Sequence, residues 1–530
     1  MKRFNNAGPS VAADNYIIDP LRRIREDEVE TLIDEKRYFI LHAPRQTGKT
    51  TCLLALRDFL NAKGDYVCVY ANIEAAQAAR NNVQSVIATV CGTIARELNF
   101  VLGSNLGREV LTRFETEEPN LRLTDYLTEL SIQVGKPLVL MLDEIDALVG
   151  DGLVSVLRQI RAGYANRPMR FPHSIILCGI RDVRDYRIVT SNREIVTGGS
   201  AFNIKAESLR LGDFTQEEIR ELYQQHTDAT GQVFDEACFP LIWRMTEGQP
   251  WLVNSVGREV TYKMRENRDP SVRIVPAMVD RAIELLIYRR DTHIDQLIDK
   301  LKEPRVKRVI EPILVGEDTA DDGLFPADDL QYCVDLGLIK RDKPIRISNG
   351  IYQEVIPREL TWTTQSVLPQ QPQWFRMADG RIDMQKLLLD FQQFFRQNAD
   401  SWIGKFDYAE AGPQLLLQAF LQRVVNGGGF IDREYGLGRG RTDLLIRQPL
   451  TNTCDGPVQR IVLELKIRRN SLERTIADGL RQTWEYMDRC GSVDEGHFIL
   501  FDRTVGKSWE ERIWHEVRDY NGHRICVWGL

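Results

Sequence analysis

The stretch YFILHAPRQTGKT, residues 38–50, decides the fold of the first half of the chain. Its apolar start, 38–41, predicts a short buried strand, and the leucine pattern that follows it predicts a helix ending at Gly64. The loop between them has the phosphate-binding spacing G-x-x-x-x-G-K-S/T, with Ala43 in place of the first glycine. A strand, such a loop and a helix together predict a phosphate cradle at a helix N-terminus.

The loop residues predicted to bind a nucleotide are Ala43, Pro44, Arg45, Gln46, Thr47, Gly48, Lys49 and Thr50. Gly48 permits close backbone approach, Lys49 would reach the β- and γ-phosphates, and the Thr50 hydroxyl would coordinate Mg²⁺. Ala43 fits this loop if it keeps a negative φ. We therefore expect ATP and Mg²⁺ as cofactors of this segment.

A second motif is the apolar run LVLML at 138–142, followed by Asp143 and Glu144. A carboxylate at the end of a buried strand costs several kcal/mol unless it meets a cation. Asp143 would orient the Mg²⁺ shell, and Glu144 would polarise the attacking water. Further apolar runs at 66–70 and 174–178 alternate with helical segments, which predicts an α/β fold with a mostly parallel sheet.

The loop, the strand with its two acids and the segment SIILCGIRD at 174–182 together resemble an AAA-type ATPase of the STAND-like branch. The resemblance covers about residues 15–285. It implies that Arg181 is a nucleotide sensor and that TEGQPW at 246–251 opens a lid helix. It also implies a homo-oligomer formed through this module. Arginine-finger candidates are Arg184, Arg187 and Arg193.

The middle of the chain predicts mainly helices. Thr215 and Glu218 have the spacing of a capping box, and helical patterning continues to about residue 315. A short helix at 328–338 followed by two strands, 339–348 and 350–356, resembles a winged-helix module that would extend the ATPase part to about residue 362. The composition of residues 362–380 predicts a linker.

A second α/β domain is predicted beyond the linker. Its expected elements are helices at 387–395, 415–425 and 471–488 and strands at 430–435, 442–447, 460–466, 497–502 and 524–528. Asp443 begins one of these strands, and Glu464 and Lys466 alternate on the next. The period of two in a strand puts Glu464 and Lys466 on the same face. Two charged side chains that point inward from an apolar strand cost free energy, which suggests that they serve a function.

This pattern, with Gln482 and Tyr486 in the following helix, resembles the PD-(D/E)xK nuclease superfamily, or restriction-endonuclease-like fold. The resemblance implies that Asp443 and Glu464 hold one or two divalent metals, Mg²⁺ or Mn²⁺, and that Lys466 positions the attacking water. Gln482 and Tyr486 would orient the lysine and the DNA backbone. The proline usually written first in the motif is Thr442 here.

Basic residues near this motif predict DNA as a partner. They are Arg439, Arg441, Arg468, Arg469, Arg474 and Arg481. Glu410 is a candidate for one further acid. The whole chain of 530 residues has a net charge of 69 − 76 = −7, which excludes a uniformly basic nucleic-acid binder but not a local basic site.

Composition also predicts the compartment. Nine scattered cysteines without a C-x-x-C pair predict neither a disulfide framework nor a zinc site, and we expect a cytoplasmic protein. No run approaches the roughly 20 apolar residues of a membrane span, and the N-terminus has no secretory signal, so no membrane partner is expected.

The leading hypothesis is an ATP-binding and ATP-hydrolysing regulatory module that controls a metal-dependent DNA nuclease, in defence against foreign DNA or in the processing of DNA ends. The alternative is a nucleotide-dependent sensor or scaffold whose nuclease-like domain binds nucleic acid or a partner without cleaving. A helicase-like motor is a third reading, weakened by the lack of a second motor domain. The expected domains are the ATPase core at 15–210, helical lid at 211–285, winged-helix-like module at 286–362, linker at 363–385 and nuclease-like domain at 386–530.

Overall fold

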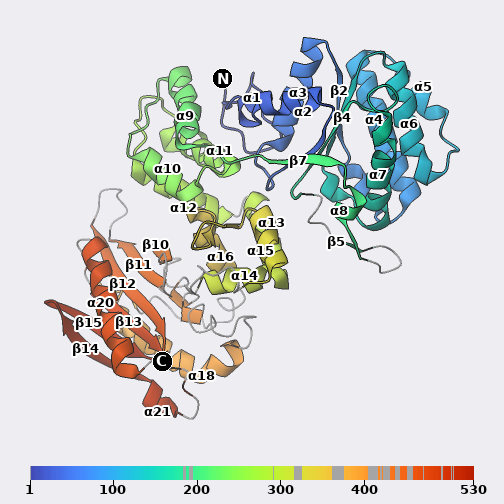
Figure 1. The fold of residues 1–530 in the computed structure, drawn as a ribbon. Helices are drawn as coiled ribbons and strands as arrows, with labels where there is room; N and C mark the ends of the chain where they lie inside the picture. The colour runs from blue at the N-terminus through green and yellow to red at the C-terminus, as the bar shows by residue number, and fades with distance from the viewer. Residues whose placement is uncertain are drawn as a thin grey trace. The chain divides into compact units, whose positions relative to one another are not determined.

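The computed structural model describes residues 2–182, 187–189, 195–289, 292–314, 325–360, 375–403, 416–417, 420–421, 430–435, 442–450, 457–468, 471–490, 493, 495–502, 504 and 507–530. The chain divides into two compact units (Figure 1). The first unit is Met1–Ala282 with Asp335–Gly337, and the second is Ile283–Val334 with Leu338–Leu530.

The first unit is built on a parallel sheet, as the sequence predicts, and this sheet has five strands. Its strands are β1 (Tyr38–His42), β2 (Val67–Asn72), β3 (Leu138–Asp143), β4 (Ser174–Gly179) and β7 (Lys205–Arg210). Their order is β2-β3-β4-β1-β7, so β4 lies between the strand before the phosphate loop and the strand that ends in Asp143. A short hairpin pairs β5 (Arg187–Val189) with β6 (Ile195–Thr197).

Helices flank this sheet and continue beyond it. They are α1 (Pro20–Arg23), α2 (Glu26–Asp34), α3 (Lys49–Lys63), α4 (Val83–Leu102), α5 (Leu106–Thr112), α6 (Pro119–Gln133), α7 (Gly150–Gly163), α8 (Gly198–Ala201), α9 (Gln216–Thr230), α10 (Cys238–Thr246), α11 (Pro250–Arg258) and α12 (Pro276–Arg289). Short helical segments lie at Glu74–Ala79, Ile145–Ala147, Tyr164–Asn166, Glu259–Lys263 and Arg265–Asn267.

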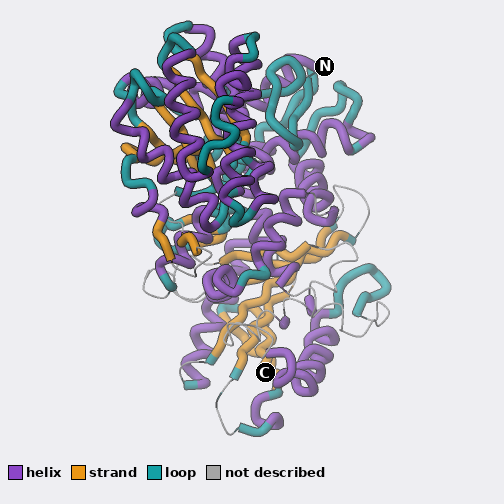
Figure 2. The backbone as a smooth tube through the Cα atoms, turned by 90° about the vertical axis from the view of Figure 1, so that its right-hand side faces the viewer, coloured by secondary structure: helices purple, strands orange, loops and turns teal. Residues whose placement is uncertain are grey.

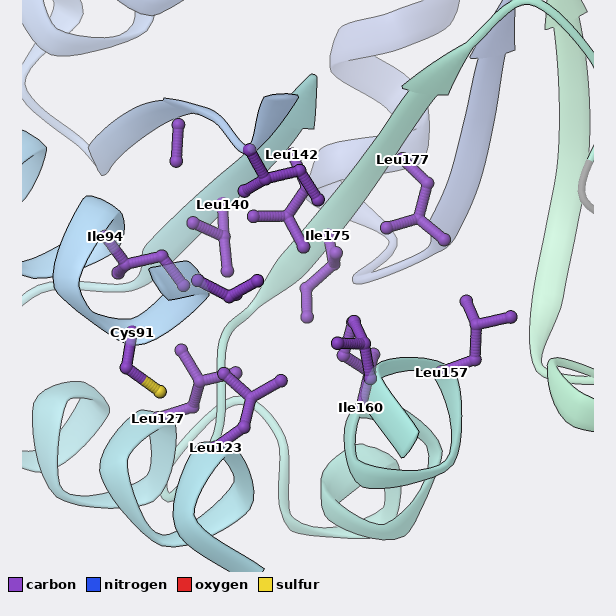
Figure 3. Packing of buried hydrophobic residues seen from close by; sticks show 14 of the residues in the cluster. Cys91, Ile94, Leu123, Leu127, Leu140, Leu142, Leu157, Ile160, Ile175 and Leu177 are labelled. Atoms are coloured by element: carbon purple, nitrogen blue, oxygen red, sulfur yellow. The ribbon is translucent and has the colours of Figure 1, made fainter. Parts of the chain in front are cut away.

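Both faces of the first sheet are buried. On one face, Leu140, Leu142, Ile175 and Leu177 of β3 and β4 pack against α4, α6 and α7 (Figure 3). The alternate residues of the same strands pack against α2 and α3 on the other face. Each buried aliphatic side chain stabilises the fold by about 1.5–3 kcal/mol. This double burial explains why the strands read as continuous apolar runs.

Helix α4 belongs to this core. Among the described helices it alone is long and apolar enough, by length and composition, to cross a membrane. The sequence alone did not predict such a run. Val86, Val90, Ile94 and Leu98 on α4 are fully or almost fully buried against the sheet and its neighbouring helices. Core helices of globular domains pass the same test, so this match is weak evidence for a membrane span.

The N-terminal segment packs against α9. The ring of Phe4 lies 4.8 Å from that of Tyr223, and the Tyr16 hydroxyl is 3.2 Å from Nδ1 of His226. Helix α9 begins with the predicted capping box, in which Thr215 and Glu218 bond to each other's backbone N–H groups. These contacts join the start of the chain to helices more than 200 residues away.

The second unit begins with helices and a two-stranded sheet. These elements are α13 (Thr292–Leu301), α14 (Pro304–Leu314), α15 (Ala327–Asp335), β8 (Ile339–Lys340), β9 (Arg346–Ile347) and α16 (Gly350–Leu360). The strand predicted at 350–356 is wrong, because this segment is helical. Asn349 Oδ1 accepts a hydrogen bond from Tyr352 N at 2.9 Å, which caps the helix. Ile351, Val355 and Ile356 are then buried at helical spacing.

A separate mixed sheet follows, between helices (Figure 2). Its strands are β10 (Phe430–Tyr435), β11 (Thr442–Pro449), β12 (Val458–Ile467), β13 (Glu495–Phe501), β14 (Trp514–Tyr520) and β15 (His523–Gly529), in the order β10-β11-β12-β13-β15-β14. Strands β12, β13 and β15 are parallel to one another, and the outer pairs are antiparallel. The helices of this part are α18 (Met384–Ile403), α20 (Leu472–Cys490) and α21 (Trp509–Arg512).

The two faces of this second sheet have different partners. Leu463 and Leu465 of β12 share a cluster with residues of α18, whereas Val462 of β12 and Phe498 of β13 share one with residues of α20. Residue 464 therefore lies on the α20 face of β12, because residues 462 and 464 are two apart in the strand. The helix predicted at 415–425 lies mostly outside the described residues.

Candidate functional site

The phosphate-loop sequence lies between β1 and α3, at the carboxyl end of the parallel sheet. Its left-handed positions are Gln46, with φ 59°, and Gly48, with φ 92°, and not Ala43. Ala43 is buried, and its N–H donates to the carbonyl of Gly179 at 3.2 Å. Alanine therefore fits the first position of the motif, since the backbone there does not need a positive φ.

Lysine and threonine side chains hold the loop in shape. Lys49 is almost fully buried, and its Nζ donates to the carbonyls of Ala43 and Pro44, each at 2.9 Å. The Thr47 hydroxyl donates to the Pro44 carbonyl at 2.8 Å. The ammonium group thus lies among the backbone groups of the loop.

Asp143 is the centre of a hydrogen-bond network at the end of β3. Its side chain is fully buried, and Oδ2 accepts hydrogen bonds from the hydroxyls of Thr50 and Tyr70, both at 2.8 Å. Oδ1 accepts from the backbone N–H of Glu144 at 2.9 Å. Thr50 and Asp143, predicted from two motifs, are thus joined directly. A hydroxyl and a carboxylate oxygen side by side are the hard ligands that Mg²⁺ prefers, so these residues fit the cation.

Glu144 follows Asp143 in a left-handed conformation, with φ 62°. Burial is the largest cause that raises the pKa of Glu144, and the Asp143 carboxylate raises it further, while Lys49 acts in the opposite direction. A positive φ is uncommon outside glycine and often marks a functional position. A carboxyl group with a raised pKa beside the phosphate loop suits the predicted contact with an attacking water.

Arg181, the predicted sensor, lies in an ion pair. Its Nε is 3.1 Å from Oδ2 of the buried Asp335, and both residues belong to the first unit. Of the arginine-finger candidates, Arg184 and Arg193 lie outside the described residues, as does the side chain of Arg187.

Two residues near the loop escaped the sequence analysis. Arg23 of α1 lies beside Gly48, where its Nη1 would be 2.7 Å from a Cβ built on the glycine. Its Nη2 also donates to the Gly212 carbonyl at 2.9 Å. Tyr70 is the second, through its bond to Asp143. Nothing in the sequence near Arg23 or Tyr70 signals these contacts, which depend on how the elements pack.

The second constellation lies on the α20 face of the mixed sheet. The register places position 443 of β11 directly opposite Glu464 of β12, although the side chain of Asp443 is outside the described part of the chain. Lys466 is half-buried two positions further along β12. Gln482 and Tyr486 are both buried on α20, and Tyr486 belongs to the apolar cluster of this face. The structure therefore places Glu464 and Lys466 on the sheet face that is covered by α20, the helix that carries Gln482 and Tyr486.

Glu464 has an unusual environment. Its side chain is fully buried, and neither carboxylate oxygen has a hydrogen-bond partner among the described residues. The Oε1 atom of the buried Gln482 is also unpartnered there. An uncompensated buried carboxylate costs several kcal/mol, so the Glu464 carboxylate is expected to meet a cation. Two unpartnered oxygens fit a divalent cation.

The basic residues around this constellation are only partly described. Arg468 pairs with Asp502 at 2.7 Å and Arg481 with Glu485 at 2.7 Å, while Arg474 is exposed. Arg439, Arg441, Arg469 and the candidate acid Glu410 lie outside the described residues. Among the described side chains, no group of three or more His, Cys, Asp or Glu residues could hold a metal ion. No disulfide bond joins any of the eight cysteines that the structure describes.

Comparison with protein-family models matches residues 10–269 to the family described as "AAA-like domain". Residues 10–269 form an AAA-like P-loop ATPase domain. The match covers the phosphate loop, Asp143, Glu144 and Arg181. It ends before the second unit, so it leaves the nuclease-like constellation without a counterpart. The comparison with curated proteins gives no match.

Solved structures resemble the chain only distantly. A Walker-type ATPase of Pyrococcus abyssi is 16% identical over 67% of this chain and 99% of its own, with a TM-score of 0.46. Cdc6p of Pyrobaculum aerophilum is 15% identical over 65% and 94%, with a TM-score of 0.36. RuvB of Thermotoga maritima is 14% identical over 63% and 94%, with a TM-score of 0.34. At these TM-scores the likenesses add no argument about function.

Proposed function

We propose that the chain is an ATP-regulated, metal-dependent DNA nuclease. In this proposal the AAA-like domain binds and hydrolyses ATP, and the mixed-sheet domain cleaves DNA. The observation that carries the nuclease assignment is the fully buried Glu464 carboxylate, which has no hydrogen-bond partner among the described residues. It lies on the sheet face covered by the helix that carries Gln482 and Tyr486.

The ATPase part rests on the geometry of the loop. The backbone N–H groups at the start of α3 would bind the phosphates, and Lys49 Nζ would exchange the two loop carbonyls for phosphate oxygens. Thr50 and Asp143 would hold Mg²⁺, which neutralises developing charge on the phosphates. Glu144 would accept a hydrogen bond from the attacking water. Arg181 would reach the nucleotide after exchanging Asp335 for phosphate.

The nuclease part rests on the α20 face of the second sheet. Asp443 and Glu464 are adjacent in register and would share one or two divalent cations, which supply charge stabilisation and an activated water. Lys466 would hold that water next to the scissile phosphate. Gln482 and Tyr486 of α20, which packs on this face, would orient the lysine. We further propose that the AAA-like domains associate as a homo-oligomer and that ATP occupancy controls cleavage.

A cleavage assay with paired variants tests the nuclease proposal. Wild type, Glu464→Gln and Glu473→Gln would be incubated with supercoiled and linear DNA in Mg²⁺ or Mn²⁺, with and without ATP. Glu473 is exposed on α20, so its variant makes the same charge change away from the proposed site. Cleavage should persist in the Glu473 variant and fall at least about 100-fold in the Glu464 variant, because a metal ligand is lost.

Equal cleavage by both variants would refute the assignment of Glu464. If wild type binds ATP but cleaves neither DNA under any condition, the sensor or scaffold alternative replaces the nuclease. That outcome would leave the ATPase part of the proposal intact, since its residues lie in the other unit.

A further inference from the structure

Tyr70 is the one aromatic side chain of the AAA-like domain that the described hydrogen bonds join to Asp143. It lies near the end of β2, where the register pairs Tyr70 with Met141 and Asn72 with Asp143. Its ring packs in the cluster between the sheet and α3. The hydroxyl, at the end of the ring, donates to Asp143 Oδ2 at 2.8 Å. The strand register thus carries the tyrosine to the carboxylate predicted to hold Mg²⁺.

The network divides the two oxygens of Asp143 between different donors. Oδ2 accepts from the hydroxyls of both Tyr70 and Thr50, Oδ1 accepts from the backbone N–H of Glu144, and the Cys178 thiol also hydrogen bonds to this carboxylate. A carboxylate oxygen has about two acceptor sites, so the two hydroxyls saturate Oδ2.

We infer that Tyr70 is a positioning residue that holds Asp143 in the orientation required for Mg²⁺–nucleotide binding. The inference rests on the proposed ATPase function. With two hydroxyls fixed on Oδ2, the carboxylate cannot rotate, and Oδ1 is presented to the metal shell. Thr50 is itself a predicted metal ligand, so its hydroxyl must serve the cation and Asp143 at once. Tyr70 is not itself a predicted metal ligand, and it keeps Oδ2 oriented when Thr50 engages the metal.

The test compares Tyr70→Phe with Tyr38→Phe in the full chain. Tyr38 is also fully buried, on β1 of the same sheet, and its hydroxyl donates to the carbonyl of Pro172 at 2.8 Å. Both variants therefore lose one buried hydroxyl, but only one of them loses a bond to Asp143. The dissociation constant of a fluorescent ATP analogue is measured in EDTA and in Mg²⁺, and the ratio of the two values gives the contribution of the cation.

The expected result is specific to the cation. In Tyr70→Phe, affinity in EDTA stays at the wild-type value, and the Mg²⁺ enhancement falls about ten-fold, because a hydrogen bond to a charged acceptor is lost. The Mg²⁺ concentration for half-maximal hydrolysis rises in parallel. Tyr38→Phe keeps the full enhancement.

Three outcomes would overturn the inference. An unchanged Mg²⁺ enhancement in Tyr70→Phe, with normal binding, would overturn the role of Tyr70 alone. Loss of binding in EDTA as well would show that the tyrosine supports the fold rather than the cation site. Absence of nucleotide binding by the wild-type chain would overturn the proposed ATPase together with this inference.

Discussion

Replacing Glu464 by glutamine should stabilise β12 when no divalent metal is present. The buried carboxylate has no partner among the described residues, and an unpaired buried charge costs several kcal/mol after relaxation. A buried amide without full pairing costs about 1–3 kcal/mol. We therefore expect Glu464→Gln to raise the free energy of opening of β12 in EDTA by about 2 kcal/mol. Most substitutions in a core strand lower the stability of the fold, whereas this one should raise it.

A bound divalent metal should reverse the order of stability of wild type and Glu464→Gln. A cation that binds only the folded wild-type site, present at 100 times its dissociation constant, stabilises that state by about 2.7 kcal/mol. Glu464→Gln lacks one ligand and should gain little. Wild type should therefore be the less stable protein in EDTA and at least equal to the variant in Mn²⁺.

Hydrogen exchange of the β12 amides, followed by mass spectrometry, is the suitable assay, because it reports local opening in a chain of two units. Glu473→Gln serves as the control and should match wild type in EDTA and in Mn²⁺. The reasoning fails if β12 exchanges faster in Glu464→Gln than in wild type in EDTA. It also fails if Mn²⁺ protects the two proteins equally.

Three further substitutions test other parts of the structure. Thr215→Ala removes half of the capping box with Glu218 and should weaken α9 by about 1 kcal/mol, seen as faster exchange of its first-turn amides. Asp502→Asn should destabilise the second unit by about 2 kcal/mol at neutral pH, because hydrogen bonds outweigh burial and hold the pKa of Asp502 below its ordinary value. That difference should be complete above the unfolded carboxyl pKa of about 4, shrink in unfolding curves as the pH falls below it, and vanish only when the pH has fallen through the lower folded pKa of Asp502. Gly479→Ala would place a Cβ 2.3 Å from the Phe498 ring and should cost about 1–3 kcal/mol by displacing α20, which denaturant unfolding would measure.

Much of the first unit could be predicted because its strands are buried on both faces. The run at 138–142 and the loop at 43–50 carry strong local signals, and the structure joins them through Thr50 and Asp143. Strands β7 and β14 escaped prediction because each lies at the edge of its sheet and has few buried side chains, so neither shows an apolar run.

The segment at 350–356 shows how a local pattern misleads. Its apolar residues suit a strand as well as a helix, and the deciding element is the Asn349 cap just before it. Tyr70 could not be assigned from its own strand, where it looks like an ordinary core residue. Its role depends on the register between β2 and β3, which the sequence does not specify.

In the proposed function, nucleotide occupancy of the AAA-like domain controls DNA cleavage by the second unit. Plasmid cleavage in Mg²⁺ across an ATP titration, with wild type, Lys49→Ala and Lys466→Ala, tests it most directly. We predict that wild-type cleavage changes with ATP, that Lys49→Ala neither hydrolyses ATP nor responds to it, and that Lys466→Ala hydrolyses ATP without cleaving. Cleavage by Lys466→Ala, or identical cleavage by wild type and Lys49→Ala at every ATP concentration, would contradict the account.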